Sequence, residues 1–137
     1  MGMYTQLFLA SDLKKDTPKE VIDVLKYMLH EIEIQPKNYP FESSRSQYML
    51  NMDSYYFDTD SRSTLRFDDI SNRYYLNVLC NLKNYHGEIE DFLNWISPFL
   101  NKLPGDFLGY KMYEEDLTPT LIYYEEVPIA TINSVKI

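Results

Sequence analysis

Residues 73–83 read Arg73-Tyr74-Tyr75-Leu76-Asn77-Val78-Leu79-Cys80-Asn81-Leu82-Lys83. Every even position of this stretch is apolar, whereas the odd positions are mostly polar. Because side chains of a β-strand alternate between two faces, the pattern predicts a strand with one face on a hydrophobic core. The stretch is long for a strand, which favours a place near the centre of a sheet.

The two faces of this strand have different expected roles. The side chains expected to face the core and its helices are Tyr74, Leu76, Val78, Cys80 and Leu82. Those expected on the opposite, wetter face are Tyr75, Asn77, Leu79 and Asn81. Any binding site of the protein is expected on this second face.

The segments before this strand predict one strand, one helix and a meander. A first strand is expected over residues 3–10, where the apolar run 7–10 indicates burial on both faces. Thr17-Pro18-Lys19-Glu20 is typical of a helix start with a capping box, and this helix should end near residues 30–33. Residues 47–57 predict strand with a bend at Asp53, and a short strand follows over 64–67.

The segments after it predict a second helix and a hairpin. The helix should begin at Asn84 and reach Leu103, with a kink or a restart at Pro98. Strands are expected over residues 107–115 and 120–127, joined by a turn. Signals become weak from Pro128, so residues 128–137 are expected to form a loose tail.

This order of elements predicts an α+β fold. A strand, a helix, a meander, a second helix and a closing strand form the βαββαβ order of a ferredoxin-like plait, here with an extra C-terminal hairpin. Both helices should cover one face of an antiparallel sheet and leave the other face free. The chain has 137 residues and no linker-like segment, so residues 1–137 should form a single domain.

The cysteine count and hydropathy bear on location. Cys80 is the only cysteine, so no internal disulfide can form, and its place on the apolar face predicts a buried thiol. No leader pattern and no run of about 18 apolar residues is present. We therefore expect a cytoplasmic protein with no membrane segment.

Charge and motif spacing disfavour several functions. The net charge is −8, and residues 88–137 carry nine acids against three lysines, which would repel a nucleic-acid backbone. The two histidines, His30 and His86, have no partners at metal-ligand spacing, and four glycines form no phosphate-binding loop. The acidic stretch 58–69 lacks the glycine of a calcium loop. We expect no metal, no cofactor and no catalytic residue.

Thirteen tyrosines make protein contact the favoured function. Tyrosine suits both strands and interfaces, and an exposed aromatic sheet face often marks a protein partner or self-association as a homodimer. Glu114 and Glu126 could share one face of the C-terminal hairpin. The expected interaction residues are Tyr75, Asn77, Leu79, Asn81, Tyr113, Glu114, Tyr124 and Glu126.

Two short stretches carry a resemblance. Met3-Tyr4-Thr5-Gln6-Leu7 and Leu82-Lys83-Asn84-Tyr85 resemble small uncharacterised proteins scattered through bacterial and phage genomes. The resemblance implies no activity and no functional residues.

The sequence thus predicts a non-enzymatic, acidic protein-interaction module with an open, Tyr-rich sheet face. One form of this hypothesis is a phage or mobile-element protein that inhibits a host protein by occupying its basic, DNA-binding surface. The alternative is a small-ligand-binding protein or an enzyme with a pocket between sheet and helices.

Overall fold

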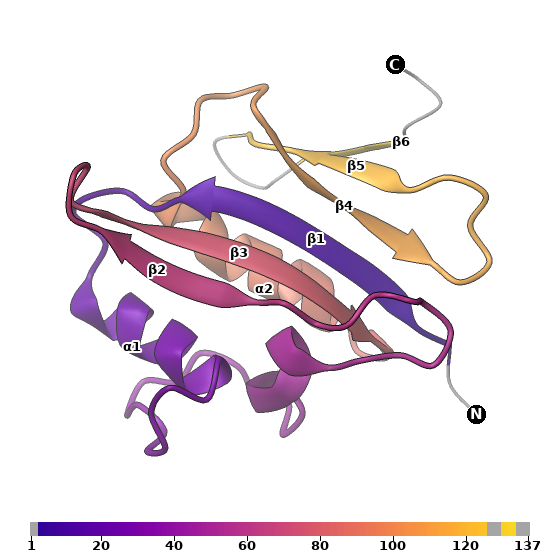
Figure 1. Cartoon of the computed structure of the whole chain (residues 1–137), viewed down its shortest axis with the longest axis horizontal. Helices are drawn as coiled ribbons and strands as arrows, with labels where there is room; N and C mark the ends of the chain where they lie inside the picture. The colour runs from indigo at the N-terminus through magenta and orange to yellow at the C-terminus, as the bar shows by residue number, and fades with distance from the viewer. Residues whose placement is uncertain (1–2, 126–129, 134–137) are drawn as a thin grey trace.

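The computed structural model describes residues 3–125 and 130–133 and has an α+β fold. Its antiparallel sheet has the strand order β2-β3-β1-β4-β5-β6 (Figure 1). The strands are β1 (Thr5–Asp12), β2 (Thr64–Asp68), β3 (Arg73–Leu82), β4 (Phe107–Tyr113), β5 (Thr120–Tyr123) and β6 (Ala130–Asn133). The helices are α1 (Lys19–Met28) and α2 (Glu88–Ile96), with 3-10 turns η1 (Ser46–Asn51) and η2 (Ser97–Phe99).

β1 occupies the middle of the sheet. It pairs along its whole length with β3, from Thr5 opposite Leu82 to Asp12 opposite Tyr75, and on its other side with β4. The prediction that β3 lies near the centre is therefore only partly right, because β3 lies between β1 and the edge strand β2. The run 7–10 explains this place: Leu7 and Leu9 are fully buried, and Phe8 and Ala10 are half-buried on the other face.

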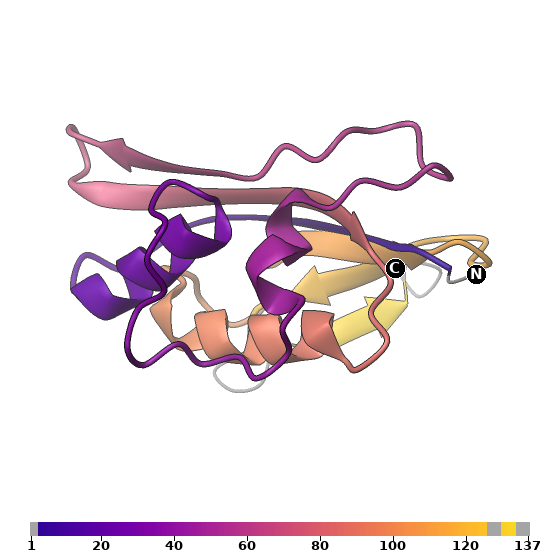
Figure 2. The ribbon, with the colours of Figure 1, turned by 90° about the horizontal axis from the view of Figure 1, so that it is seen from below.

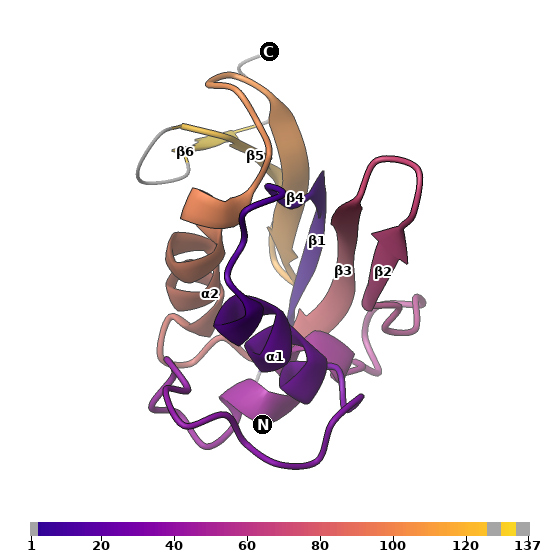
Figure 3. The same ribbon diagram turned by 90° about the vertical axis from the view of Figure 1, so that its left-hand side faces the viewer.

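The core lies between the sheet and the two helices, which cover the same face (Figures 2 and 3). Leu76, Val78, Cys80 and Leu82 of β3 are buried there, as their alternation predicts. Tyr74 is half-buried against the same core. The buried apolar residues of the helices recur at helical spacing and are Val21, Ile22, Val24, Leu25 and Met28 in α1 and Ile89, Phe92, Leu93 and Ile96 in α2.

The predicted strand over residues 47–57 is wrong. Residues 46–51 form η1, which buries the adjacent pair Met49 and Leu50; a strand would place these two on opposite faces. Residues 55–58 form bends, because the Ser54 hydroxyl accepts hydrogen bonds from the backbone N–H groups of Tyr56 and Phe57.

The helix starts also differ from the prediction. The Thr17 hydroxyl donates to the Lys14 carbonyl and does not cap, so Pro18 is the N-cap of α1. α2 begins four residues later than Asn84, whose side-chain carbonyl accepts the backbone N–H of Ile89. Both helices are also shorter than predicted: α1 ends before His30, which has a positive φ of 63°, and Pro98 restarts the chain as η2.

The C-terminal segment adds one more strand to the sheet. Residues 130–133 pair with β5 as β6, from Thr120 opposite Asn133 to Tyr123 opposite Ala130. The remainder of the predicted loose tail, including residues 134–137, lies outside the described residues.

In the part of the chain that the structure describes, no helix is long and apolar enough to cross a bilayer.

Cys80 is fully buried, as predicted. Removal from water disfavours the charged thiolate, so burial raises the pKa of the Cys80 thiol well above its ordinary value. The residue therefore acts as a small apolar side chain in the core.

An ion pair joins α2 to the sheet, and it predicts a pH dependence. Lys111 Nζ lies 2.8 Å from Glu90 Oε2. Burial alone would raise the pKa of Glu90, but the hydrogen bond and positive charge of Lys111, together with a hydrogen bond from Asn84, outweigh it, so this pKa lies below its ordinary value of 4.5. A lowered pKa stabilises the fold above the unfolded-state value, and this contribution is lost as the pH falls through the folded-state value.

We therefore expect Glu90→Gln to lower the free energy of unfolding at about pH 7 and to have little effect at about pH 3. The loss should stay below about 1 kcal/mol because the pair is partly exposed. Urea unfolding at both pH values measures this loss in the free energy of unfolding. Glu33→Gln, at an exposed site outside the helices, is the control. An equal loss at both pH values would contradict the role of the ionised carboxylate.

Candidate functional site

The sheet face opposite the helices is the predicted binding face, here called the open face. Within residues 3–125 and 130–133, no helix covers it (Figure 2). Strand registers and alternation bring together side chains from the four strands between the two edges. They include Gln6, Phe8 and Ala10 of β1, Tyr75, Asn77, Leu79 and Asn81 of β3, Tyr110 and Met112 of β4, and Leu121 of β5.

Aromatic rings lie along this face. Phe8 and Tyr110, opposite each other in register, stack with ring centroids 5.5 Å apart and an angle of 29° between planes. The Tyr110 hydroxyl donates to Gln6 Oε1 at 2.9 Å, and burial raises the pKa of this hydroxyl. The Arg66 guanidinium lies 4.7 Å from the ring centroid of Tyr75. These rings are half-buried, so part of each remains available for contact.

The loop 52–63 covers one end of the open face. The side chain of Asn81 donates to the carbonyl of Thr59 at 3.2 Å, and the Thr59 hydroxyl accepts from Gln6 Nε2 at 2.6 Å. The backbone N–H of Asn81 donates to the Met52 carbonyl. As a result Asn81 is fully buried, and the expectation that it offers its side chain to a partner is wrong.

The other predicted interaction residues are divided among several places. Tyr75 and Leu79 are half-buried on the open face, and Asn77 is exposed there. Tyr113 pairs with Thr5 on the opposite side of the sheet, where its hydroxyl donates to Met3 Sδ. Tyr124 is buried in the core, and Glu126 lies outside the described residues.

Glu114 belongs to a group of carboxylates at the end of the sheet where β1 begins. Its Oε1 accepts the backbone N–H of Tyr4 at 3.1 Å. The Tyr56 hydroxyl donates to the Glu114 carbonyl at 3.2 Å and so ties the loop 52–63 to the β4–β5 turn. We call the acidic groups of these two segments the acidic end: Asp53, Asp58, Asp60, Glu114, Glu115 and Asp116.

Exposed tyrosines accompany the acidic end. Tyr55 is 74% exposed and Tyr56 52% exposed, and Tyr55 contacts the Tyr4 ring edge-on with centroids 5.7 Å apart. The sequence could not place these groups together, because the two segments are more than fifty residues apart and part of one of them was predicted as a strand.

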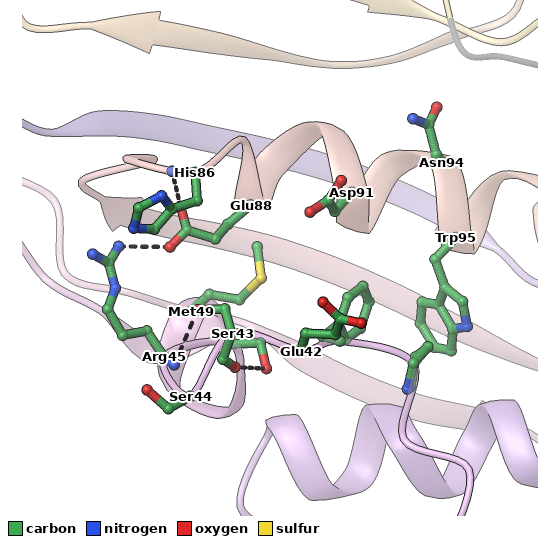
Figure 4. Close-up of a pocket in the computed structure, with 13 residues that line it drawn as sticks. Glu42, Ser43, Ser44, Arg45, Met49, His86, Glu88, Asp91, Asn94 and Trp95 are labelled. Atoms are coloured by element: carbon green, nitrogen blue, oxygen red, sulfur yellow. Dashed lines mark hydrogen bonds and ion pairs between the residues drawn. The ribbon is translucent and has the colours of Figure 1, made fainter.

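A pocket of about 790 Å³ lies on the opposite side of the molecule (Figure 4). It is formed by residues 40–46 and 49 on one wall and by His86 and α2 on the other. The alternative function predicted a pocket between sheet and helices; this one lies between a loop and the outer surface of α2.

The open face with its acidic end and the α2 pocket are thus two separate candidate sites. Each is built from residues distant in sequence.

In comparisons with known proteins, no family model, no curated protein and no solved structure matches the chain.

Proposed function

We propose that this protein is a non-enzymatic interaction module that binds a basic surface of a partner protein through the open face and the acidic end. The observation that carries the proposal is the open face, which no helix of the described residues covers and which bears half-buried aromatic rings and ends in a group of carboxylates. Aromatic side chains are enriched where proteins meet, and complementary charge selects the partner and speeds association.

Two further observations support a basic partner. The exposed Tyr55 and Tyr56 stand beside the carboxylates, and tyrosine rings attract guanidinium and ammonium groups. The net charge of −8 gives the whole molecule a long-range attraction for cations. A phage or mobile-element protein that occupies the basic, DNA-binding surface of a host protein is one form that this function takes.

We also propose that β1–β4, α1 and α2 form a ferredoxin-like plait. The antiparallel neighbours β2-β3-β1-β4, with both helices on one face, support this, and β5 with β6 supplies the additional hairpin. Such a sheet has one face free for binding, which fits the proposed function.

Asn77 offers a sharp test because it is exposed on the open face. We expect Asn77→Arg to repel a basic partner and to weaken its binding at least tenfold, about 1.4 kcal/mol. Asn38→Arg, at an exposed loop position, makes the same change in net charge and should bind like the wild type. Partners are captured from the organism that encodes the chain, identified by mass spectrometry and purified. Each partner is then titrated against the wild type, Asn77→Arg and Asn38→Arg.

The salt dependence of partner binding and the oligomeric state of the protein are two further measurements that test the proposal. Binding should weaken between about 50 mM and about 300 mM salt, because the attraction is between exposed charges. Equal binding by Asn77→Arg and Asn38→Arg, or affinity unchanged by salt, would overturn the proposal. A dimer in sedimentation experiments that only Asn77→Arg dissociates would replace the partner protein with a second copy of this chain.

A further inference from the structure

The α2 pocket has features that select one class of ligand. Glu88, Asp91 and Trp95 lie at positions i, i+3 and i+7 of one helix and so share a face, which is separate from its buried stripe. Glu42 and Arg45 stand on the facing wall, with Met49 at the base (Figure 4). Phe41 also lines the pocket. At about 790 Å³, the pocket is in the size range of small-molecule sites.

The positive charge of the pocket is already paired. Arg45 Nη2 lies 2.8 Å from Glu88 Oε2, and the Glu88 side chain is only 5% exposed. The other oxygen of Glu88 accepts the backbone N–H of His86 at 3.1 Å. The Arg45 guanidinium also lies 5.1 Å from the ring centroid of Tyr85. Arg45 is therefore held against α2 by Glu88, which neutralises its charge.

The negative charge of the pocket is not paired. Glu42 and Asp91 are both exposed. Within residues 3–125 and 130–133, neither carboxylate has an ion-pair partner. Since Glu88 is neutralised by Arg45, these two carboxylates give the pocket its net charge.

Aromatic rings stand beside the two carboxylates. Phe41 and Trp95 meet edge to face, with ring centroids 5.3 Å apart, and both are half-buried and line the pocket. Tryptophan offers the strongest cation–π attraction of the aromatic side chains, and a weakly hydrated planar cation gains most from it.

We propose that the α2 pocket binds a small organic cation with a guanidinium or alkylammonium group. The cationic head lies between Glu42 and Asp91, and its apolar part contacts Phe41 and Trp95. This site is separate from the open face, and the proposal stands whether or not the proposed function holds.

Trp95 gives a direct readout because it is the only tryptophan of the chain. The probes are butylguanidinium and butylurea, which have closely similar shapes and differ in charge. We expect a saturable change in Trp95 fluorescence with butylguanidinium, with a dissociation constant of about 1 mM or lower, and none with butylurea. Sodium chloride at matched ionic strength should leave the emission unchanged.

Variants assign the binding to the two carboxylates. Glu42→Gln with Asp91→Asn should weaken butylguanidinium binding at least tenfold, about 1.4 kcal/mol. Glu33→Gln with Asp69→Asn removes the same charges from exposed positions outside the pocket and should bind like the wild type. Circular dichroism checks that both double variants fold.

The outcomes separate the sources of such a cation. A third probe is arginine with its amino and carboxyl groups blocked. If it binds as well as butylguanidinium, the natural ligand is the arginine side chain of a protein. If it binds more weakly than butylguanidinium, the natural ligand is a free metabolite. Equal responses to butylguanidinium and butylurea, no saturable response, or equal weakening in both double variants would overturn the proposal.

Discussion

Replacing Gly109 by alanine should lower the free energy of unfolding by at least about 3 kcal/mol, because the added methyl group has no room. A Cβ at this position would lie 1.9 Å from the carbonyl oxygen of Phe8 and 2.7 Å from its carbonyl carbon. Both atoms belong to the backbone of β1, which is held by β3 on one side and β4 on the other. Only a separation of β1 from β4 would relieve the clash.

Gly109 lies where the pairing of β4 with β5 shifts its register between Phe107 and Gly109. Glycine inside a strand often marks such a shift or the close approach of another backbone, and here both are present. Urea unfolding followed by Trp95 fluorescence and circular dichroism measures the loss.

Gly105→Ala is the matched control. Gly105 has a φ of 96° but no atom within 4 Å of an added Cβ, so only backbone strain of about 1–3 kcal/mol opposes the change. A loss for Gly109→Ala no larger than that for Gly105→Ala would contradict the close approach of β1 to Gly109.

Replacing Phe92 by alanine should cost about 3–5 kcal/mol, the usual range when a buried phenylalanine leaves a cavity. Phe92 of α2 is fully buried and belongs to a ring cluster with Phe41 and Trp95, at centroid distances of 6.3 Å and 6.0 Å. Phe41 is anchored on the loop before η1 and Trp95 on α2 itself, so neither ring can easily fill the space. Thermal and urea unfolding should both report the change.

Phe67→Ala removes a ring of the same size from the edge strand β2. Phe67 is 46% exposed and contacts the ring of Tyr74 edge-on, so its loss should cost less than about 1.5 kcal/mol. Similar losses for the two variants would show that the cluster around Phe92 packs loosely. Because Phe92 lies beneath the α2 pocket, its variant should also weaken butylguanidinium binding.

Local patterns predicted the parts of the fold that depend on side-chain periodicity. The alternation of β3 correctly placed Leu76, Val78 and Cys80 in the core, and the buried residues of α1 and α2 also recur at helical spacing. These features depend on which side chains avoid water, and a sequence records that directly. The contacts at the helix starts were predicted less well, because Thr17 does not cap α1 and no spacing rule specifies the hydrogen bond from the Ile89 backbone to the Asn84 side chain.

The sequence predicted the candidate sites less well than it predicted the fold. Alternation assigned Asn77 and Asn81 to the same face, but only the structure reveals that the loop 52–63 covers Asn81. Residues 54–57 of that loop were predicted as part of a strand, and aromatic residues do favour strands, but Ser54 bends the backbone there. The α2 pocket joins a loop to a helix more than forty residues away, so nothing local predicts it.

The middle position of β1 has a consequence for how the chain folds during synthesis. Leu7 and Leu9 emerge from the ribosome long before Cys80 and Val78, their partners on β3, and before Lys111 and Gly109 on β4. At about 5–20 residues per second, this apolar strand waits several seconds for its neighbours. Contacts so distant along the chain also make folding slow. Newly made β1 therefore exposes apolar side chains to water and to other chains for several seconds.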